Sequence, residues 1–130
     1  VVPFEAGVAL ADTAEDFRRM VQKILRLIYV PDREEVRSTR TSVMGAAQTS
    51  PAIAEEIKII NFEVCSGIAA VLHSAQEKNW VRQDIDPLVS AYWIIGQLIG
   101  RVVAEMDQGR VNLDQWNHIS EDSILQHLFG

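Results

Sequence analysis

The stretch that decides the fold is residues 88–103, which reads LVSAYWIIGQLIGRVV and follows the polar segment 79–87. Its apolar residues recur at helical spacing, but they cover most of the circumference of the predicted helix. A helix that is apolar nearly all round must be buried on more than one side. In a chain of 130 residues, we expect a second subunit to cover one of those sides.

The composition is that of an ordinary globular domain, with 48% hydrophobic and 23% charged residues. We treat 1–130 as one domain, with residues 1–11 as a linker or a fraying start. The formal charge of −6 argues against specific binding of duplex DNA by this chain alone, because phosphate binding needs an excess of Lys and Arg. The single cysteine excludes an intramolecular disulfide and fits a reducing compartment.

A membrane-spanning segment is not expected, because the longest apolar candidate, 88–106, carries Gln97, Arg101 and Glu105. We therefore expect a cytoplasmic protein that has no contact with a membrane.

Helix signals also dominate the chain before residue 79. Asp12 and Glu15 form a capping-box pattern, and apolar residues recur at helical spacing from Phe17 until Pro31 ends the helix. A second helix, with only a thin apolar stripe, is predicted over about 32–47.

Two Pro residues then mark helix starts. Ser50 with Pro51 and Asp86 with Pro87 each place a capping side chain before a proline at the first helical position. The first of these helices should run to about residue 78, with an inward stripe of Ile53, Ile57, Ile60, Val64, Ile68, Val71 and Ala75.

The chain should end in one more helix. We expect Gly109 to end the apolar helix and the last helix to begin near Ser120. The predicted fold is an all-α antiparallel bundle of about five helices that dimerises through its last two.

Side chains suited to catalysis or metal binding form no recognisable pattern. His73, His118 and His127 share no metal-ligand spacing. Cys65 has no His one turn away, which favours a small buried hydrophobe over a nucleophile. Acidic residues occur as adjacent pairs, which do not converge on a helix. We expect no enzyme activity, no metal and no cofactor.

Three arginines, Arg33, Arg37 and Arg40, recur at helical spacing in the second predicted helix. A solvated helix face explains the first two. Arg40, however, lies by rotation between Val36 and Met44, on the side expected to face the core. A buried guanidinium must be paired, so its partner is a carboxylate of this chain or an acidic or carbonyl-bearing ligand.

Gly96 and Gly100 lie one helical turn apart. Glycine costs about 1 kcal/mol relative to Ala inside a helix, and the usual reason for such a pair is close approach of another helix. The two alternatives are a subunit contact and a contact within the chain. The first predicts a two-fold dimer built from 87–107 and 119–130, with interface residues Val89, Trp93, Gly96, Gly100, Val103, Leu125 and Phe129.

A ligand cavity is expected beneath the thinly apolar second helix, the alternative being a filled core. Methionines suit an adaptable wall, because the unbranched thioether repacks around different shapes. Arg40 or Tyr92 would orient the ligand. The predicted cavity residues are Phe17, Met20, Ile24, Arg40, Met44, Cys65, Ile68, Leu72 and Tyr92.

The sequence WVRQDIDP at 80–87, between a long helix and a Gly-bearing apolar helix, resembles the C-terminal region of TetR-family transcriptional regulators. The likeness covers about 13–130, although Trp80 stands where the family often has Gly. It implies an apolar effector cavity and a homodimer. It also implies DNA binding through an N-terminal helix-turn-helix domain that these residues do not include. Effector binding would then change the angle between the two DNA-reading domains.

Two other function classes remain open. One is a helical protein-interaction module without a ligand, and the other is a small helical enzyme acting on an apolar substrate. A cavity of roughly 300 Å³ or more would favour a ligand-binding domain over a plain interaction module. An enzyme would need convergent titratable groups.

Overall fold

The computed structural model describes residues 11–29 and 34–130, and every regular element within these ranges is an α-helix. This confirms the predicted all-α fold. The helices are α2 (Ala14–Ile28), α3 (Glu34–Ala47), α4 (Pro51–Glu77), α5 (Pro87–Glu105) and α6 (Leu113–Phe129). Pro31, Arg33 and the expected start of the second helix near residue 32 lie outside the described residues.

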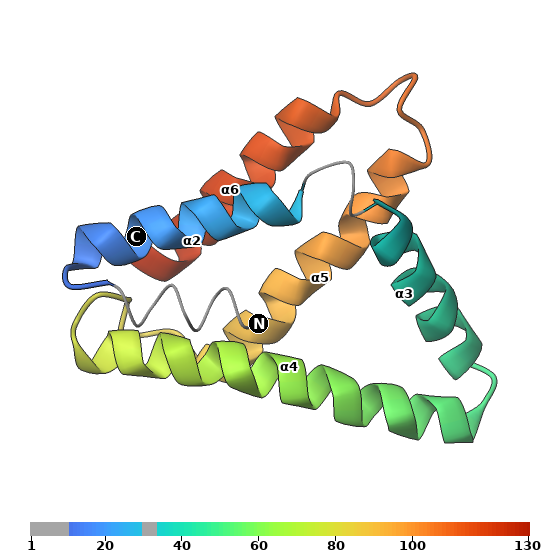
Figure 1. Cartoon of the computed structure of the whole chain (residues 1–130), viewed down its shortest axis with the longest axis horizontal. Helices are drawn as coiled ribbons and strands as arrows, with labels where there is room; N and C mark the ends of the chain where they lie inside the picture. The colour runs from blue at the N-terminus through green and yellow to red at the C-terminus, as the bar shows by residue number, and fades with distance from the viewer. Residues whose placement is uncertain (1–10, 30–33) are drawn as a thin grey trace.

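Helix α5 is the central element of the fold. It packs against α3, α4 and α6, while α2 packs along α6. Figure 1 shows α2 and α6 side by side and antiparallel, α4 along the opposite edge and α3 along a third edge. The apolar circumference of α5 is thus partly explained by contacts within the chain.

The two Ser/Asp-Pro starts are confirmed. The Ser50 side chain accepts a hydrogen bond from the backbone N–H of Ile53, and Asp86 accepts one from Val89 at 2.9 Å. Each cap satisfies a backbone donor that lacks an intrahelical partner.

Three predicted helix boundaries are wrong. The cap of α2 is Thr13, whose hydroxyl accepts from the N–H of Asp16, rather than Asp12. Helix α5 ends at Glu105, four residues before Gly109, because the chain turns at once to bring α6 back. The last helix begins at Leu113 instead of Ser120, and Asn112 caps it.

The core joins α2, α4 and α6 at one end of the molecule. Phe17, Leu72, Ile124 and Leu128 are almost completely buried there, and the ring of Phe17 meets the ring of Phe129 edge-on at 6.0 Å. Burial of each large apolar side chain contributes about 1.5–3 kcal/mol. Nearer its N-terminus α4 is more open, and Ile60, predicted to point inward, is 50% exposed.

The turn between α4 and α5 is held by one buried amide. The Gln76 side chain donates to the backbone oxygens of Arg82 and Ile85, at 2.8 and 3.0 Å. Asn79 adopts a left-handed backbone with φ 59°, the conformation that commonly ends a helix. The turn thus uses Asn79, and not Trp80, at the position where a glycine would be favoured.

Two helices, α4 and α5, are long and apolar enough to cross a membrane by length and composition alone. The core helices of soluble proteins pass the same test, so this is weak evidence for a membrane span. The absence of membrane contact and the cytoplasmic location stay predictions.

Candidate functional site

A cavity of about 250 Å³ lies between the helices, and all five of them contribute to its wall. Its lining is mainly aliphatic and includes Ile24 and Ile28 of α2 and Val64 and Ile68 of α4. The two charged residues of the lining are Arg37 and Arg40, both from α3. This volume is slightly below the roughly 300 Å³ at which pockets for drug-sized ligands begin, so the cavity suits a small ligand.

Three of the predicted cavity residues, Ile24, Arg40 and Ile68, line this cavity. Arg40 is partly buried and makes no hydrogen bond or ion pair with the residues that the structure describes. Its guanidinium nevertheless lies close enough to Cys65 to favour the thiolate.

The other predicted cavity residues lie elsewhere. Phe17, Cys65 and Leu72 are completely buried in side-chain packing and do not line the space. Met20 packs against the same core, and Met44 is partly buried on α3 outside the lining. Tyr92 is 42% exposed and does not reach the cavity. The cavity therefore lies further along α2 and α5 than the sequence pattern indicated.

The α5 wall of the cavity was not predicted from the sequence; it is formed by Ile94, Ile95, Leu98 and Ile99. Their spacing of one, four and five residues marks one face of a helix. That face was hidden in the sequence because the opposite face of α5 is apolar too.

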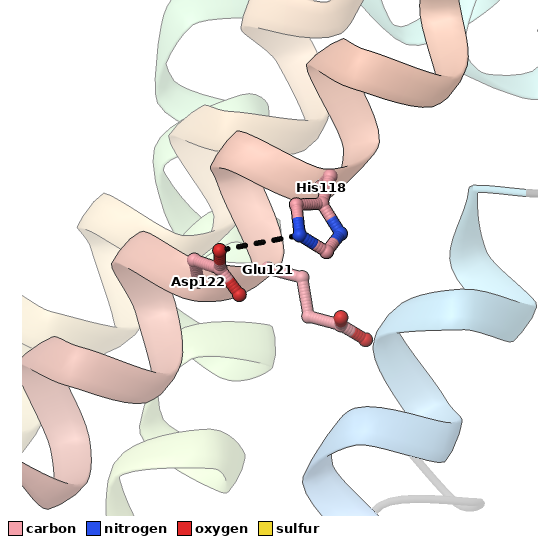
Figure 2. Close-up of side chains that lie close together, drawn as sticks. All are labelled: His118, Glu121 and Asp122. Atoms are coloured by element: carbon pink, nitrogen blue, oxygen red, sulfur yellow. Dashed lines mark ion pairs between the residues drawn. The ribbon is translucent and has the colours of Figure 1, made fainter.

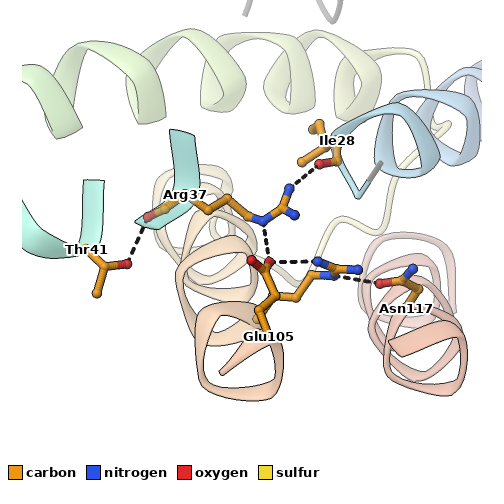
Figure 3. A network of polar contacts seen from close by, with 6 residues as sticks. Ile28, Arg37, Thr41, Glu105 and Asn117 are labelled. Carbon is orange, nitrogen blue, oxygen red and sulfur yellow. Dashed lines mark hydrogen bonds and ion pairs between the residues drawn. The ribbon is translucent and has the colours of Figure 1, made fainter. Parts of the chain in front are cut away.

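A buried ion-pair network borders the cavity at Arg37 (Figure 3). Arg37 Nε donates to Glu105 Oε1 at 2.5 Å, and Nη1 donates to the backbone oxygen of Ile28 at 2.8 Å. The side chains of Arg37 and Glu105 are 5% and 4% exposed. The expectation that Arg37 lies on a solvated face is therefore wrong, because its carboxylate partner comes from a distant helix.

The network continues into α5 and α6 through Arg101. Arg101 Nη1 donates to the same Glu105 oxygen at 2.7 Å, and Nε donates to Asn117 Oδ1 at 2.8 Å. The guanidinium carbon also lies 5.7 Å from the ring centre of Tyr29 and 5.9 Å from that of Trp116. These contacts connect α2, α3, α5 and α6 in one polar cluster.

The charges of this cluster do not balance. Arg37 and Arg101 share the single carboxylate of Glu105, which leaves one formal positive charge in a buried region. In addition, Nη2 of Arg37 is buried and has no hydrogen-bond partner among the described residues. An unpaired buried donor is costly, and Arg37 is one of the residues that line the cavity.

Two uncharged groups have shifted pKa values, Tyr29 beside the cluster and Cys65 near Arg40. Burial raises the pKa of the Tyr29 hydroxyl, and a hydrogen bond of 2.5 Å with Ser120 acts in the opposite direction. Burial likewise raises the pKa of the Cys65 thiol, with Arg40 opposing the shift. A thiol with a raised pKa is a poor nucleophile at neutral pH.

The face of α5 opposite the cavity wall is exposed to solvent. Val89, Trp93 and Val103 are 66%, 38% and 74% exposed. A methyl group added at Gly96 or Gly100 would meet no other part of the described chain within 4 Å. Among the described residues, no intrachain helix contact explains these glycines.

Two residues expected at the dimer interface do not lie on that face. Leu125 is 3% exposed and belongs to the core of the chain, and Phe129 packs against that core. Helix α6 instead exposes Ile119, at 67%, and the residue after α5, Met106, is 82% exposed. Both residues lie within the predicted interface segments 87–107 and 119–130, although neither is among the individual interface residues predicted there.

His118, Glu121 and Asp122 bring three possible metal-ligand atoms within 4.8 Å of one another. Figure 2 shows His118 directed toward Asp122, with Glu121 directed toward α2. Glu121 there accepts a 2.8 Å hydrogen bond from Arg26 Nε. Since His118 Nε2 also lies 3.5 Å from Asp122 Oδ2, all three groups already have a partner within the chain, and we assign no metal site to this cluster.

Comparison with protein-family models, curated proteins and solved structures gives no match for this chain. The likeness to TetR-family regulators therefore rests on the sequence alone and stays a prediction.

Proposed function

We propose that this chain is the effector-sensing and dimerisation domain of a TetR-like transcriptional regulator. The observation that carries the proposal is the division of α5 into two apolar faces. One face, with Ile94 and Leu98, lines the cavity, and the other, with Val89 and Val103, is exposed. A single helix thus connects the ligand site to the surface that would meet the second subunit.

In this proposal a small apolar effector enters the cavity and changes the position of α5. A two-fold dimer pairs the same surface on both subunits, so a movement of α5 alters the angle between them. The change is limited to the difference in effector affinity between the two arrangements. A separate helix-turn-helix domain would read DNA, and the protein would act in the cytoplasm without an enzymatic step.

A second candidate, a protein-interaction module, is favoured by one observation on α4. Ile59, Ile60 and Phe62 are 52%, 50% and 54% exposed on this helix. Exposed apolar patches commonly mark binding surfaces. The two candidates therefore place the contact surface on different helices.

Sedimentation velocity of three variants tests the proposal. A charged residue at the centre of a packed apolar interface is strongly unfavourable, so Gly100→Glu and Val103→Glu should convert the dimer to a monomer. Ile59→Glu, which places the same charge on an exposed apolar position of α4, is the matched control and should leave the dimer intact. Loss of the dimer only in Ile59→Glu would favour the second candidate. A monomeric wild-type chain would contradict the dimer.

A further inference from the structure

We infer that the cavity binds a small amphiphile with a carboxylate head group, held at the α3 end by Arg37 and Arg40. The inference rests on the proposed effector site and specifies the chemistry of its ligand. Three features of the described residues support it, namely the unpaired donor, the excess positive charge and the aliphatic wall.

The first feature is the free donor on Arg37. Its Nε and Nη1 are occupied by Glu105 and by the backbone oxygen of Ile28, but Nη2 is buried without a partner. Arg37 lines the cavity, and its side chain is only 5% exposed. Buried polar groups in native proteins are almost always hydrogen-bonded, so a ligand oxygen is the natural partner for this donor.

The second feature is the charge at the same end. Arg37 and Arg101 share one carboxylate, and Arg40 adds a further guanidinium to the lining with no ion-pair partner among the described residues. A singly charged anion would offset the buried excess. The guanidinium group suits a planar carboxylate, because its parallel N–H groups match the two oxygens.

The third feature, the aliphatic wall, indicates the chemistry of the ligand beyond its head group. Beyond the two arginines the wall is aliphatic, and Ile68 of α4 and Ile94 and Leu98 of α5 are among the residues that line its volume of about 250 Å³. An alkyl chain or a small ring fits this surface. A long-chain lipid would not fit within that volume.

Three probes with one alkyl chain and different head groups test the inference on the full 130-residue chain. The probes are octanoate, octanol and octylamine, and the readouts are isothermal calorimetry and thermal unfolding. A ligand that binds only the folded state raises its stability. We expect octanoate to raise the melting temperature and to bind about tenfold or more tighter than octanol, since charge-assisted hydrogen bonds are the stronger ones. Octylamine should not bind.

Two variants test whether Arg37 and Arg40 donate hydrogen bonds to the carboxylate head group. Arg40→Gln should weaken octanoate binding about tenfold and leave octanol binding unchanged. Arg37→Lys keeps a cation beside Glu105 but removes Nη2, so it should also reduce the preference for octanoate. Arg19→Gln is the matched control, because Arg19 is an exposed arginine of α2 outside the cavity lining, and it should change neither affinity.

Several outcomes would overturn the inference. Equal affinity for octanoate and octanol would show that the head group is not recognised, while the proposed effector cavity would stand. An octanoate preference that survives both arginine variants would place the head group elsewhere. Failure of all three probes to bind at millimolar concentration would also refute it, and the sedimentation experiment would then decide the dimer independently.

Discussion

Arg37 and Glu105 lie 68 residues apart in the sequence, and they form a buried ion pair in which Nε and Oε1 are 2.5 Å apart. Both side chains are at least nine-tenths buried. Removing one partner of such a pair costs more than replacing both, because it leaves an uncompensated charge in the interior. Glu105 compensates two arginines, so its loss should be the most damaging single change in the network.

We therefore expect Glu105→Ala to lower the free energy of unfolding by about 3–5 kcal/mol. Urea denaturation followed by circular dichroism measures this. Glu63→Ala, at an exposed position of α4, is the control and should stay within about 0.5 kcal/mol of wild type. Equal effects of the two substitutions would mean that the network contributes no special stability.

The left-handed residue in the turn between α4 and α5 gives a second prediction. Asn79 has φ 59°, a conformation that costs about 1–2 kcal/mol for residues with a Cβ other than Asn and Asp. Asn79→Ala should therefore destabilise the chain by about 1 kcal/mol, while Asn79→Gly should be neutral or stabilising. Chemical denaturation of both variants checks the order, and equal stability of the Ala and Gly variants would contradict it.

Tyr29 gives a prediction about pH. The chain has two tyrosines, so in Tyr92→Phe the tyrosinate absorbance reports Tyr29 alone. Because burial raises the pKa of Tyr29, its ionisation in the folded protein should require a pH above about 10, the ordinary value. The same variant unfolded in urea is the control and should ionise near that ordinary value.

The sign of the linked stability follows from the direction of this shift. Between the unfolded and the folded pKa, the folded state holds more protons, so the free energy of unfolding falls as pH rises. The contribution of Tyr29 to the free energy of unfolding is fully present below about pH 10. It is lost as the pH rises through the pKa that Tyr29 has in the folded state. A midpoint at or below the unfolded value would contradict the burial of this hydroxyl.

Cys65 should be almost inert toward thiol reagents in the folded protein. It is completely buried, and burial raises the pKa of its thiol. Since the thiolate is the reactive form, labelling by N-ethylmaleimide should be slow at neutral pH and rapid in urea. As the chain has one cysteine, Cys65→Ser gives the zero of the assay. Fast labelling without denaturant would mean that the thiol is accessible.

The helices themselves were well predicted from local sequence signals. Ser50 and Asp86 cap α4 and α5 as expected, because cap, proline and apolar period all lie within a few residues of one another. The start of α6 was missed because its first turns, from Leu113 to His118, are mostly polar and partly exposed. A helix without a clear apolar stripe gives little periodic signal.

The candidate site was predicted only in part. Ile24, Arg40 and Ile68 line the cavity, but the arginine of α3 that is buried is Arg37, one turn before Arg40. Arg37 rather than Arg40 is buried because its partner is Glu105, which lies far along the chain. Spacing within one helix cannot reveal such a partner. Likewise, an all-round apolar α5 does not reveal which face meets the cavity and which stays exposed.

The hydrogen bonds of Gln76 to Arg82 and Ile85 have a mechanical consequence for α4. Together with the 2.9 Å bond from Arg82 N–H to the Leu128 oxygen, they fix the C-terminal end of this helix to the start of α5 and to the end of α6. A helix of 27 residues is about 40 Å long. A small rotation of α4 about its anchored end near Gln76 would therefore cause a large displacement at its other end. A ligand that displaced Val64 or Ile68, near the middle of the helix, would move the N-terminal end at Pro51 furthest, together with α3, which packs against α4.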